Sequence, residues 1–209
     1  MTEQRKKVFL VSRPFSFLFT EKSDNVRLTS AFVSFCTEDG IFASFGHKPE
    51  RSFDLSLLVD AWSEEKEASD TIFGISKGQW DYGVCGIFEE SLLPSVIHGE
   101  YEILPISEVK EGHAELFMYD EAGNLKKESG EIVGVHAESQ TPIWFTLDEG
   151  EEPVTFGVSG AVVIQDEKIA AVVCGADEKE STHLYCSSAE QMMTMIDEAK
   201  EAWQNEKDQ

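Results

Sequence analysis

Ser159 stands between two glycines in the segment Gly157-Val158-Ser159-Gly160, directly before an apolar run. A serine hydroxyl becomes a nucleophile at neutral pH when a neighbouring base takes its proton and N–H donors hold the oxyanion that forms. Gly157 can adopt backbone angles closed to other residues, so its N–H and that of Ser159 can point at one spot. The segment therefore predicts acyl transfer, with Ser159 as nucleophile and Gly157 and Ser159 as the oxyanion hole. A glycine-rich turn before a strand is the alternative.

Two other segments carry the residues that such a serine needs. His47 ends a short apolar segment that begins after the hairpin signal Asp39-Gly40. Asp81 opens a later apolar segment, so the chain order is His47, Asp81, Ser159. Asp54 is another acid before an apolar run, but it follows His47 too closely for the chain to return across a barrel. Asp81 is therefore the preferred acid.

This order and its context resemble the trypsin-like (chymotrypsin-fold) serine peptidases. In that family the histidine ends a strand of a first barrel, the aspartate opens a later strand of the same barrel, and Gly-x-Ser-Gly lies in a second barrel. The resemblance covers nearly the whole chain, from about Leu28 to the last helix. The segments that carry it, besides the three residues, are 30–33, 80–84, 159–164 and 169–175.

The resemblance implies a role for each residue of the triad. His47 would accept the proton of Ser159, and Asp81 would hold the imidazole in the required tautomer and stabilise its charged form. A peptide bond of a polypeptide substrate would be hydrolysed through an acyl-enzyme, without a metal or a cofactor. We expect the segments 153–156 and 172–175 to wall the substrate pocket. The residues expected to contact substrate are Phe156, Val173, Cys174 and Gly175.

Three residues depart from the family's pattern. Val158 stands where an acidic or polar residue is common, so activation by pairing with a cleaved N-terminus is not available, and we expect the protein to be made in its final form. Ala161 replaces a frequent glycine, and Phe45 replaces a usual small residue. The alternative function is accordingly an inactive trypsin-like domain that serves as an acidic protein-binding or scaffold module. The missing activation device also predicts control by a regulatory protein partner.

The serine segment also comes close to the nucleophile elbow of α/β-hydrolases. Gly157, Ser159 and Ala161 have the elbow's spacing, and Asp177 and His183 follow in the order that those enzymes use. An elbow turns into a helix, however, whereas the residues after Ser159 alternate like a β-hairpin. We therefore prefer the trypsin-like interpretation.

Composition limits the class of protein and its partners. The chain has 209 residues, of which 41% are hydrophobic, and this fits a folded protein with ample core. A formal charge of −23 argues against nucleic-acid or anionic membrane partners, because phosphates would be repelled. No apolar stretch approaches a membrane span, and Arg13 and Pro14 break the first apolar run, which is poor for a signal peptide. We expect a cytoplasmic protein.

The four cysteines stand singly in apolar segments and form no Cys-x-x-Cys pair, so buried free thiols are expected and structural zinc is not. They are Cys36, Cys85, Cys174 and Cys186.

Short apolar segments separated by turn signals predict an all-β protein. With the resemblance, the expected fold is two six-stranded antiparallel barrels and a C-terminal helix, divided into 1–98, 99–187 and 188–209. Segment 62–69 is predicted to be a charged loop or helical turn, and 94–110 the connection between the halves. Ser187–Glu190 has capping-box spacing before an amphipathic helix. The predicted strands are 8–11, 15–19, 28–36, 41–45, 53–59, 71–75, 82–88, 114–119, 126–137, 143–147, 161–164, 169–173 and 184–186.

Overall fold

The computed structural model describes most of the chain. The predicted site residues His47, Asp81, Phe156 and Gly157 lie outside the described residues. The division into three domains stays a prediction. The described residues are 6–11, 16–21, 27–46, 53–59, 64–67, 70–74, 82–87, 97–120, 122–135, 143–154, 158–176 and 181–207.

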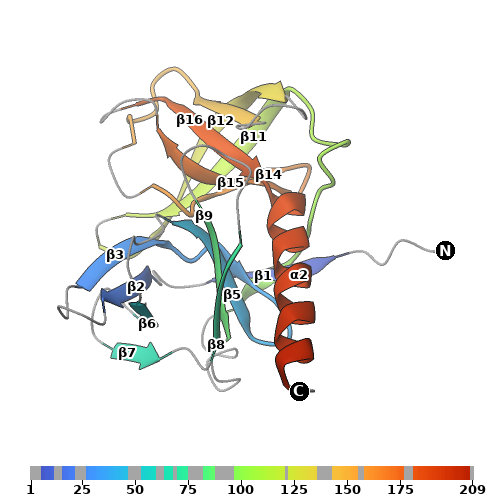
Figure 1. Ribbon diagram of the computed structural model, residues 1–209. Helices are drawn as coiled ribbons and strands as arrows, with labels where there is room; N and C mark the ends of the chain where they lie inside the picture. The colour runs from blue at the N-terminus through green and yellow to red at the C-terminus, as the bar shows by residue number, and fades with distance from the viewer. Residues whose placement is uncertain are drawn as a thin grey trace.

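The second half of the chain forms a closed antiparallel barrel with the strand order β11-β12-β13-β16-β15-β14, in the upper part of Figure 1. Alternation of side chains builds its interior: in β13, Ile143, Phe145 and Leu147 are buried, and the residues between them are partly exposed. The predicted second barrel is confirmed. Its strands are β11 (Gly112–Tyr119), β12 (Leu125–Val135), β13 (Ile143–Leu147), β14 (Val162–Gln165), β15 (Lys168–Ala176) and β16 (His183–Ser188).

The hairpin that joins β14 to β15 has a two-residue turn. Asp166 and Glu167 both have positive φ, 51° and 61°, as a type I′ turn requires. The strand pair behind the serine segment is therefore a β-hairpin, which also argues against an α/β-hydrolase elbow.

The first half consists of two antiparallel sheets. One has the order β10-β1-β4-β5-β9-β8, and the other has the order β3-β2-β6-β7. The prediction of a closed first barrel is confirmed only in part, because the described strands of this half form two sheets that do not close into a barrel. The bounds are β1 (Lys7–Val11), β2 (Ser16–Glu21), β3 (Arg27–Phe32), β4 (Phe35–Cys36), β5 (Ile41–Gly46), β6 (Phe53–Val59), β7 (Glu64–Glu67), β8 (Asp70–Gly74), β9 (Tyr82–Ile87) and β10 (Ile97–Glu102).

Strand pairing explains why the six-stranded sheet stays open. A barrel closes when its two outer strands pair with each other. Here β10 is an outer strand, and the chain just after it continues toward the other half: Ile103 bridges Ile169 in parallel, and Leu104 N donates to Ile169 O at 2.8 Å. The end of β10 thus joins the two halves.

Three sequence predictions need correction. Segment 62–69 contains β7, an outer strand whose polar sequence Glu-Glu-Lys-Glu lacks the alternation of a half-buried strand. Segment 94–110 contains β10, so it is more than a connection. The predicted strand 28–36 is divided at Val33 and Ser34, where the chain passes from one sheet to the other.

Helix α2 (Ala189–Lys207) packs against both halves of the molecule (Figure 1). It contacts β15 and β16 of the barrel and β5, β8 and β9 of the first half. Its cap lies one residue later than the predicted capping box, because Ser188 Oγ accepts from Gln191 N at 3.1 Å. None of the described helical residues forms a stretch long and apolar enough to cross a membrane.

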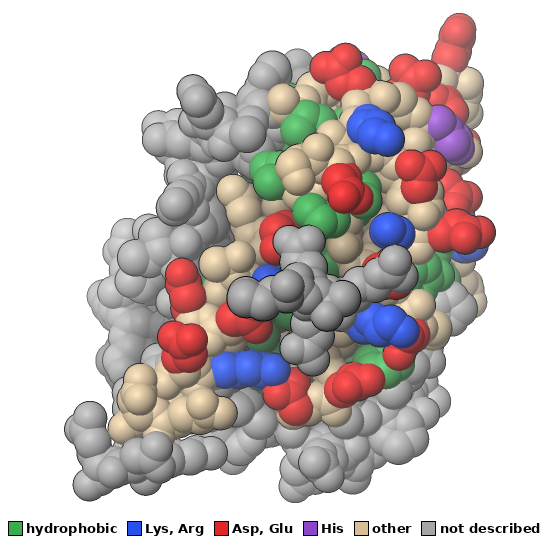
Figure 2. Space-filling model, turned by 90° about the vertical axis from the view of Figure 1, so that its right-hand side faces the viewer, with side chains coloured by type: hydrophobic (Ala, Val, Ile, Leu, Met, Phe, Trp, Pro, Cys, Tyr) green, Lys and Arg blue, Asp and Glu red, His purple; other side chains and the backbone are tan. Residues whose placement is uncertain are grey.

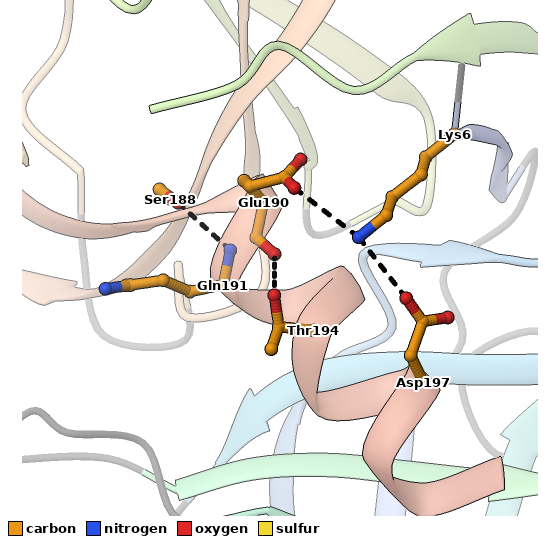
Figure 3. A network of polar contacts seen from close by, with 6 residues as sticks. All are labelled: Lys6, Ser188, Glu190, Gln191, Thr194 and Asp197. Atoms are coloured by element: carbon orange, nitrogen blue, oxygen red, sulfur yellow. Dashed lines mark hydrogen bonds and ion pairs between the residues drawn. The ribbon is translucent and has the colours of Figure 1, made fainter. Parts of the chain in front are cut away.

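Ion pairs attach the start of the chain to this helix. Lys6 Nζ lies 3.4 Å from Glu190 Oε1 and 3.2 Å from Asp197 Oδ2, which is about two helical turns further along α2 (Figure 3). Thr194 Oγ1 donates to the carbonyl of Glu190 at 3.0 Å in the same network. Acidic side chains surround the few basic ones on this face of the molecule (Figure 2). Because such exposed pairs contribute little each, they orient the helix more than they stabilise it.

Another ion pair attaches α2 to the β4–β5 turn. Lys200 Nζ lies 2.6 Å from Asp39 Oδ2, and Thr37 Oγ1 also donates to this carboxylate. Burial would raise the pKa of Asp39, but the hydrogen bonds from Lys200 and Thr37 outweigh it and lower the pKa.

Asp39→Asn is expected to reduce stability at pH 7 by roughly 0.5 kcal/mol, because the pair is partly exposed. With a lowered pKa in the folded state, the carboxylate's contribution is present above its ordinary pKa of 3.8 and is lost as the pH falls through the folded value. Urea unfolding of the wild type and variant should therefore differ at pH 7 and converge at about pH 2. Glu38→Gln is the control, and an Asp39→Asn effect of equal size at both pH values would contradict the assignment.

Candidate active site

Ser159 sits in a tight turn at the entrance to β14. Ala161 N donates to Val158 O at 2.9 Å, which closes a four-residue turn with Ser159 and Gly160 at its centre. Gly160 has a φ of +93°, the conformation that a type II turn requires at its third position. This requirement explains the glycine after the serine and leaves Ser159 partly exposed at the corner of the turn.

Strand β15 holds the turn in place. Gly160 N donates to Val173 O, and Val173 N donates to Ala161 O, each at 2.8 Å. The Ser159 hydroxyl donates to the carbonyl of Cys174, also at 2.8 Å. The structure therefore brings two of the predicted substrate-contacting residues, Val173 and Cys174, to the serine turn.

A β-bulge brings the Cys174 carbonyl to the serine. On β16, Cys186 pairs with Val173 and Tyr185 pairs with Gly175, so Cys174 is an extra residue between two register pairs. A bulge redirects the backbone and side chain of the extra residue. The Cys174 thiol lies 3.4 Å from Ser187 Oγ, whereas its carbonyl accepts from Ser159.

Burial disfavours the reactive thiolate form of the described cysteines. Cys36, Cys174 and Cys186 are buried thiols outside disulfides, as predicted, whereas the side chain of Cys85 is outside the described part. Burial raises the pKa of Cys36 to about 12. Burial, with a smaller effect of Cys174, also raises the pKa of Cys186. Since the thiolate is the reactive form, Cys36 and Cys186 are poorly suited to act as nucleophiles.

Hydrogen bonds attach the segment before the serine turn to the barrel. Val154 and Ser181 form a bridge with N···O distances of 2.9 and 3.2 Å. Further back, Glu151 Oε1 accepts from Ser129 N at 3.4 Å. Residues 155–157, which include the predicted Phe156 wall and the Gly157 oxyanion donor, are outside the described residues.

Glu151 also shares a hydrogen bond with Glu128, which is 3% exposed. Burial opposes ionisation of Glu128, but hydrogen bonds with Glu151 and Lys126 outweigh it and lower its pKa. The shared bond raises the pKa of Glu151. The Glu151 side chain thus links this segment to β12 through the backbone N–H of Ser129. In the described ranges, no three His, Cys, Asp or Glu side chains are grouped so that they could hold a metal ion.

The serine turn faces the first half of the chain. A cavity of about 20 Å³ separates them, close to the volume that one water molecule needs. Beside it, the Tyr119 hydroxyl donates to the Val11 carbonyl across the two halves, and burial raises the pKa of Tyr119. The residues that line the cavity are Leu10, Val11, Val33, Ser34, Phe117, Met118, Tyr119, Leu125, Gly160, Ala161 and Val162.

The predicted base and acid adjoin a described strand pair. Strand β5 ends at Gly46, the residue before His47, and β9 begins at Tyr82, the residue after Asp81. Gly46 and Tyr82 are register partners in the antiparallel pair. The two described strand ends that flank these positions therefore lie side by side.

An aromatic pair beside Gly175 was not predicted from the sequence. Tyr185 of β16 lies opposite Gly175, and Trp144 of β13 lies opposite Tyr185. The two rings meet edge to face, with centroids 6.2 Å apart. The only sequence signal for this contact is a glycine near the end of one strand and a tyrosine in the next strand. The signal predicts a contact only when the register between the two strands is known.

Neither a protein-family model nor a curated protein sequence matches the chain. Solved structures do match. The Rv3671c protease from M. tuberculosis, in its active form, is 16% identical with a TM-score of 0.56, over 88% of this chain and 79% of that one. Kallikrein-related peptidase 10 is 12% identical with a TM-score of 0.60, over 90% and 95%. The chain has the trypsin-like serine protease fold. Protease Anisep from Arthrobacter nicotinovorans shares this trypsin-like fold, at 12% identity and a TM-score of 0.54, over 87% and 93%.

Proposed function

We propose that this chain is a serine endopeptidase in which Ser159 attacks the peptide bond, His47 is its base and Asp81 orients His47. The observation that carries the proposal is the Ser159 turn. In a trypsin-like fold, a partly exposed serine hydroxyl stands at a glycine-dependent corner, hydrogen-bonded to a backbone carbonyl at 2.8 Å. A turn that served only to join two strands would not need a hydroxyl at that corner.

The strand ends of the first half support the choice of base and acid. Because Gly46 and Tyr82 are register partners, His47 and Asp81 are each one residue beyond the same end of the β5–β9 pair. The same argument disfavours Asp54, which lies within β6 in the other sheet of this half and pairs with Thr20. The pairing of Gly46 with Tyr82 thus supports Asp81 over Asp54.

The chemistry follows from the roles of these groups. His47 takes the hydroxyl proton as Ser159 Oγ bonds to the carbonyl carbon, and the N–H groups of Gly157 and Ser159 hold the resulting oxyanion. The C–N bond then breaks, and the leaving amine receives the proton from His47. Water, deprotonated by His47, hydrolyses the acyl-enzyme and frees Ser159. The substrate is a polypeptide, and a regulatory protein partner controls the enzyme because Val158 leaves no acid to pair with a cleaved N-terminus.

A fluorophosphonate probe tests the proposal, because it bonds covalently to an activated serine whatever the peptide preference. The native protein should be labelled, and Ser159→Ala should abolish the labelling. Ser129→Ala is the matched control, since Ser129 is half-buried in β12 of the same barrel and should leave labelling intact. An intact fold without labelling would instead favour an acidic protein-binding or scaffold module.

A further inference from the structure

Tyr185 occupies the space beside Gly175, next to the serine turn. A Cβ built on Gly175 would lie 2.2 Å from the Tyr185 hydroxyl oxygen and 2.5 Å from its Cζ atom. Distances this short exclude any side chain at position 175 unless the tyrosine moves. The tyrosine ring therefore lies directly against the strand that contacts Ser159.

The ring is held from its other side. Trp144 lies opposite Tyr185 in the register of β13 and β16, and the two rings meet at 67°. Tyr185 also packs against the hydrophobic cluster that contains Cys174 and Met192. Because neighbours hold it on both sides, Tyr185 forms a fixed wall.

The geometry of attack brings substrate to this wall. Ser159 Oγ is 2.8 Å from the Cys174 carbonyl, and a carbonyl carbon that it attacks must approach Oγ to about 3–3.5 Å. The cut peptide bond therefore lies beside Cys174 and Gly175. The trypsin-like resemblance implies that Val173, Cys174 and Gly175 contact the substrate side chain on the acyl side of the cut, which places that side chain close to Tyr185.

We propose that Tyr185 limits the depth of the pocket for this side chain, so that the enzyme selects small, uncharged residues such as alanine, serine and valine before the cut. This inference rests on the proposed peptidase function. The described residues beside the ring, Trp144, Cys174 and Gly175, carry no charge. A buried substrate charge would find no partner among them and would be costly to desolvate.

The test is cleavage of peptides that differ only in the residue before the cut: alanine, valine, phenylalanine or arginine. The wild type should cleave after alanine and valine with a kcat/KM about tenfold or more above that for phenylalanine and arginine. Tyr185→Ala should raise the phenylalanine-to-alanine ratio by about tenfold or more, because it removes the ring. Tyr185→Phe keeps the ring and should keep the wild-type ratio. Tyr101→Ala, which removes a half-buried tyrosine from β10, is the matched control.

The outcomes separate this inference from the proposed function. If the probe labels Ser159 but the wild type prefers phenylalanine or arginine, or if Tyr185→Ala leaves the ratio unchanged, the inference is wrong and the peptidase stands. If labelling and cleavage are both absent, both are wrong. Thermal melting checks each variant's fold. Should Tyr185→Ala not fold, Tyr185→Leu replaces it and must also admit phenylalanine, while the wild-type preference can overturn the inference without any variant.

Discussion

His47→Ala is expected to lower kcat on a peptide substrate by about 10⁶-fold, because Ser159 would lose the base that takes its proton. Asp81→Asn is expected to lower it by about 10⁴-fold, since the imidazole would be held in the wrong tautomer. Both losses should appear in kcat with little change in KM, because these groups act in the transition state. Steady-state kinetics on a cleaved peptide, with thermal melting to check the fold, would measure both.

Matched control variants test whether the loss of activity is specific to His47 and Asp81. His113 is exposed on β11, and Asp54 is the competing acid on β6, so His113→Ala and Asp54→Asn should leave kcat within about twofold of wild type. A large loss in Asp54→Asn, with a small one in Asp81→Asn, would overturn the choice of acid. A small loss in His47→Ala would overturn the whole mechanism.

Gly130→Ala is expected to cost about 3 kcal/mol or more of unfolding free energy. Gly130 is buried on β12, and a Cβ there would lie 2.4 Å from Phe145 Cζ and 2.4 Å from the Thr146 carbonyl oxygen. The phenylalanine ring could turn aside, but the carbonyl belongs to the neighbouring strand β13 and cannot. Relief would therefore require β12 and β13 to separate within the barrel that carries Ser159. Urea unfolding measures the loss.

Two variants show whether the contact with the Thr146 carbonyl causes the loss of stability in Gly130→Ala. Ser129→Ala changes the adjacent, half-buried position and should alter stability by less than about 0.5 kcal/mol. Phe145→Leu in the Gly130→Ala background should restore little, because the Thr146 carbonyl remains. A full rescue would mean that the ring, and not the backbone, limits the space.

Local patterns in the sequence predicted much of the architecture. Asp39-Gly40 marked a hairpin that the structure contains, with Gly40 at a φ of +82°. The alternation in Ile143–Leu147 predicted a half-buried strand, and the apolar spacing after Ser188 predicted helix α2. These features depend on residues within a few positions of one another, so short stretches of sequence are sufficient to specify them.

Pairing between distant strands was harder to predict. The polar strand β7 lies at a sheet edge, where no alternation is required, and its sequence predicts a charged loop or helical turn instead. Resemblance to the family suggested a closed first barrel, but the chain leaving β10 bridges to Ile169. Which strands pair with each other depends on segments far apart in the chain, so no local sequence pattern predicts the pairing.

The candidate site likewise combines features that local sequence predicts with features that depend on pairing between distant strands. The glycine-flanked serine before a β-hairpin follows from short stretches of sequence, because the positive φ of Gly160 and the two-residue turn at Asp166-Glu167 are local requirements. The surroundings of that serine depend on the packing of distant strands. The bulge that turns the Cys174 carbonyl to Ser159, and the tyrosine that covers Gly175, arise from the register between β15 and β16. Register is set by the packing of the whole barrel, and a shift of one residue would turn Tyr185 to the opposite face.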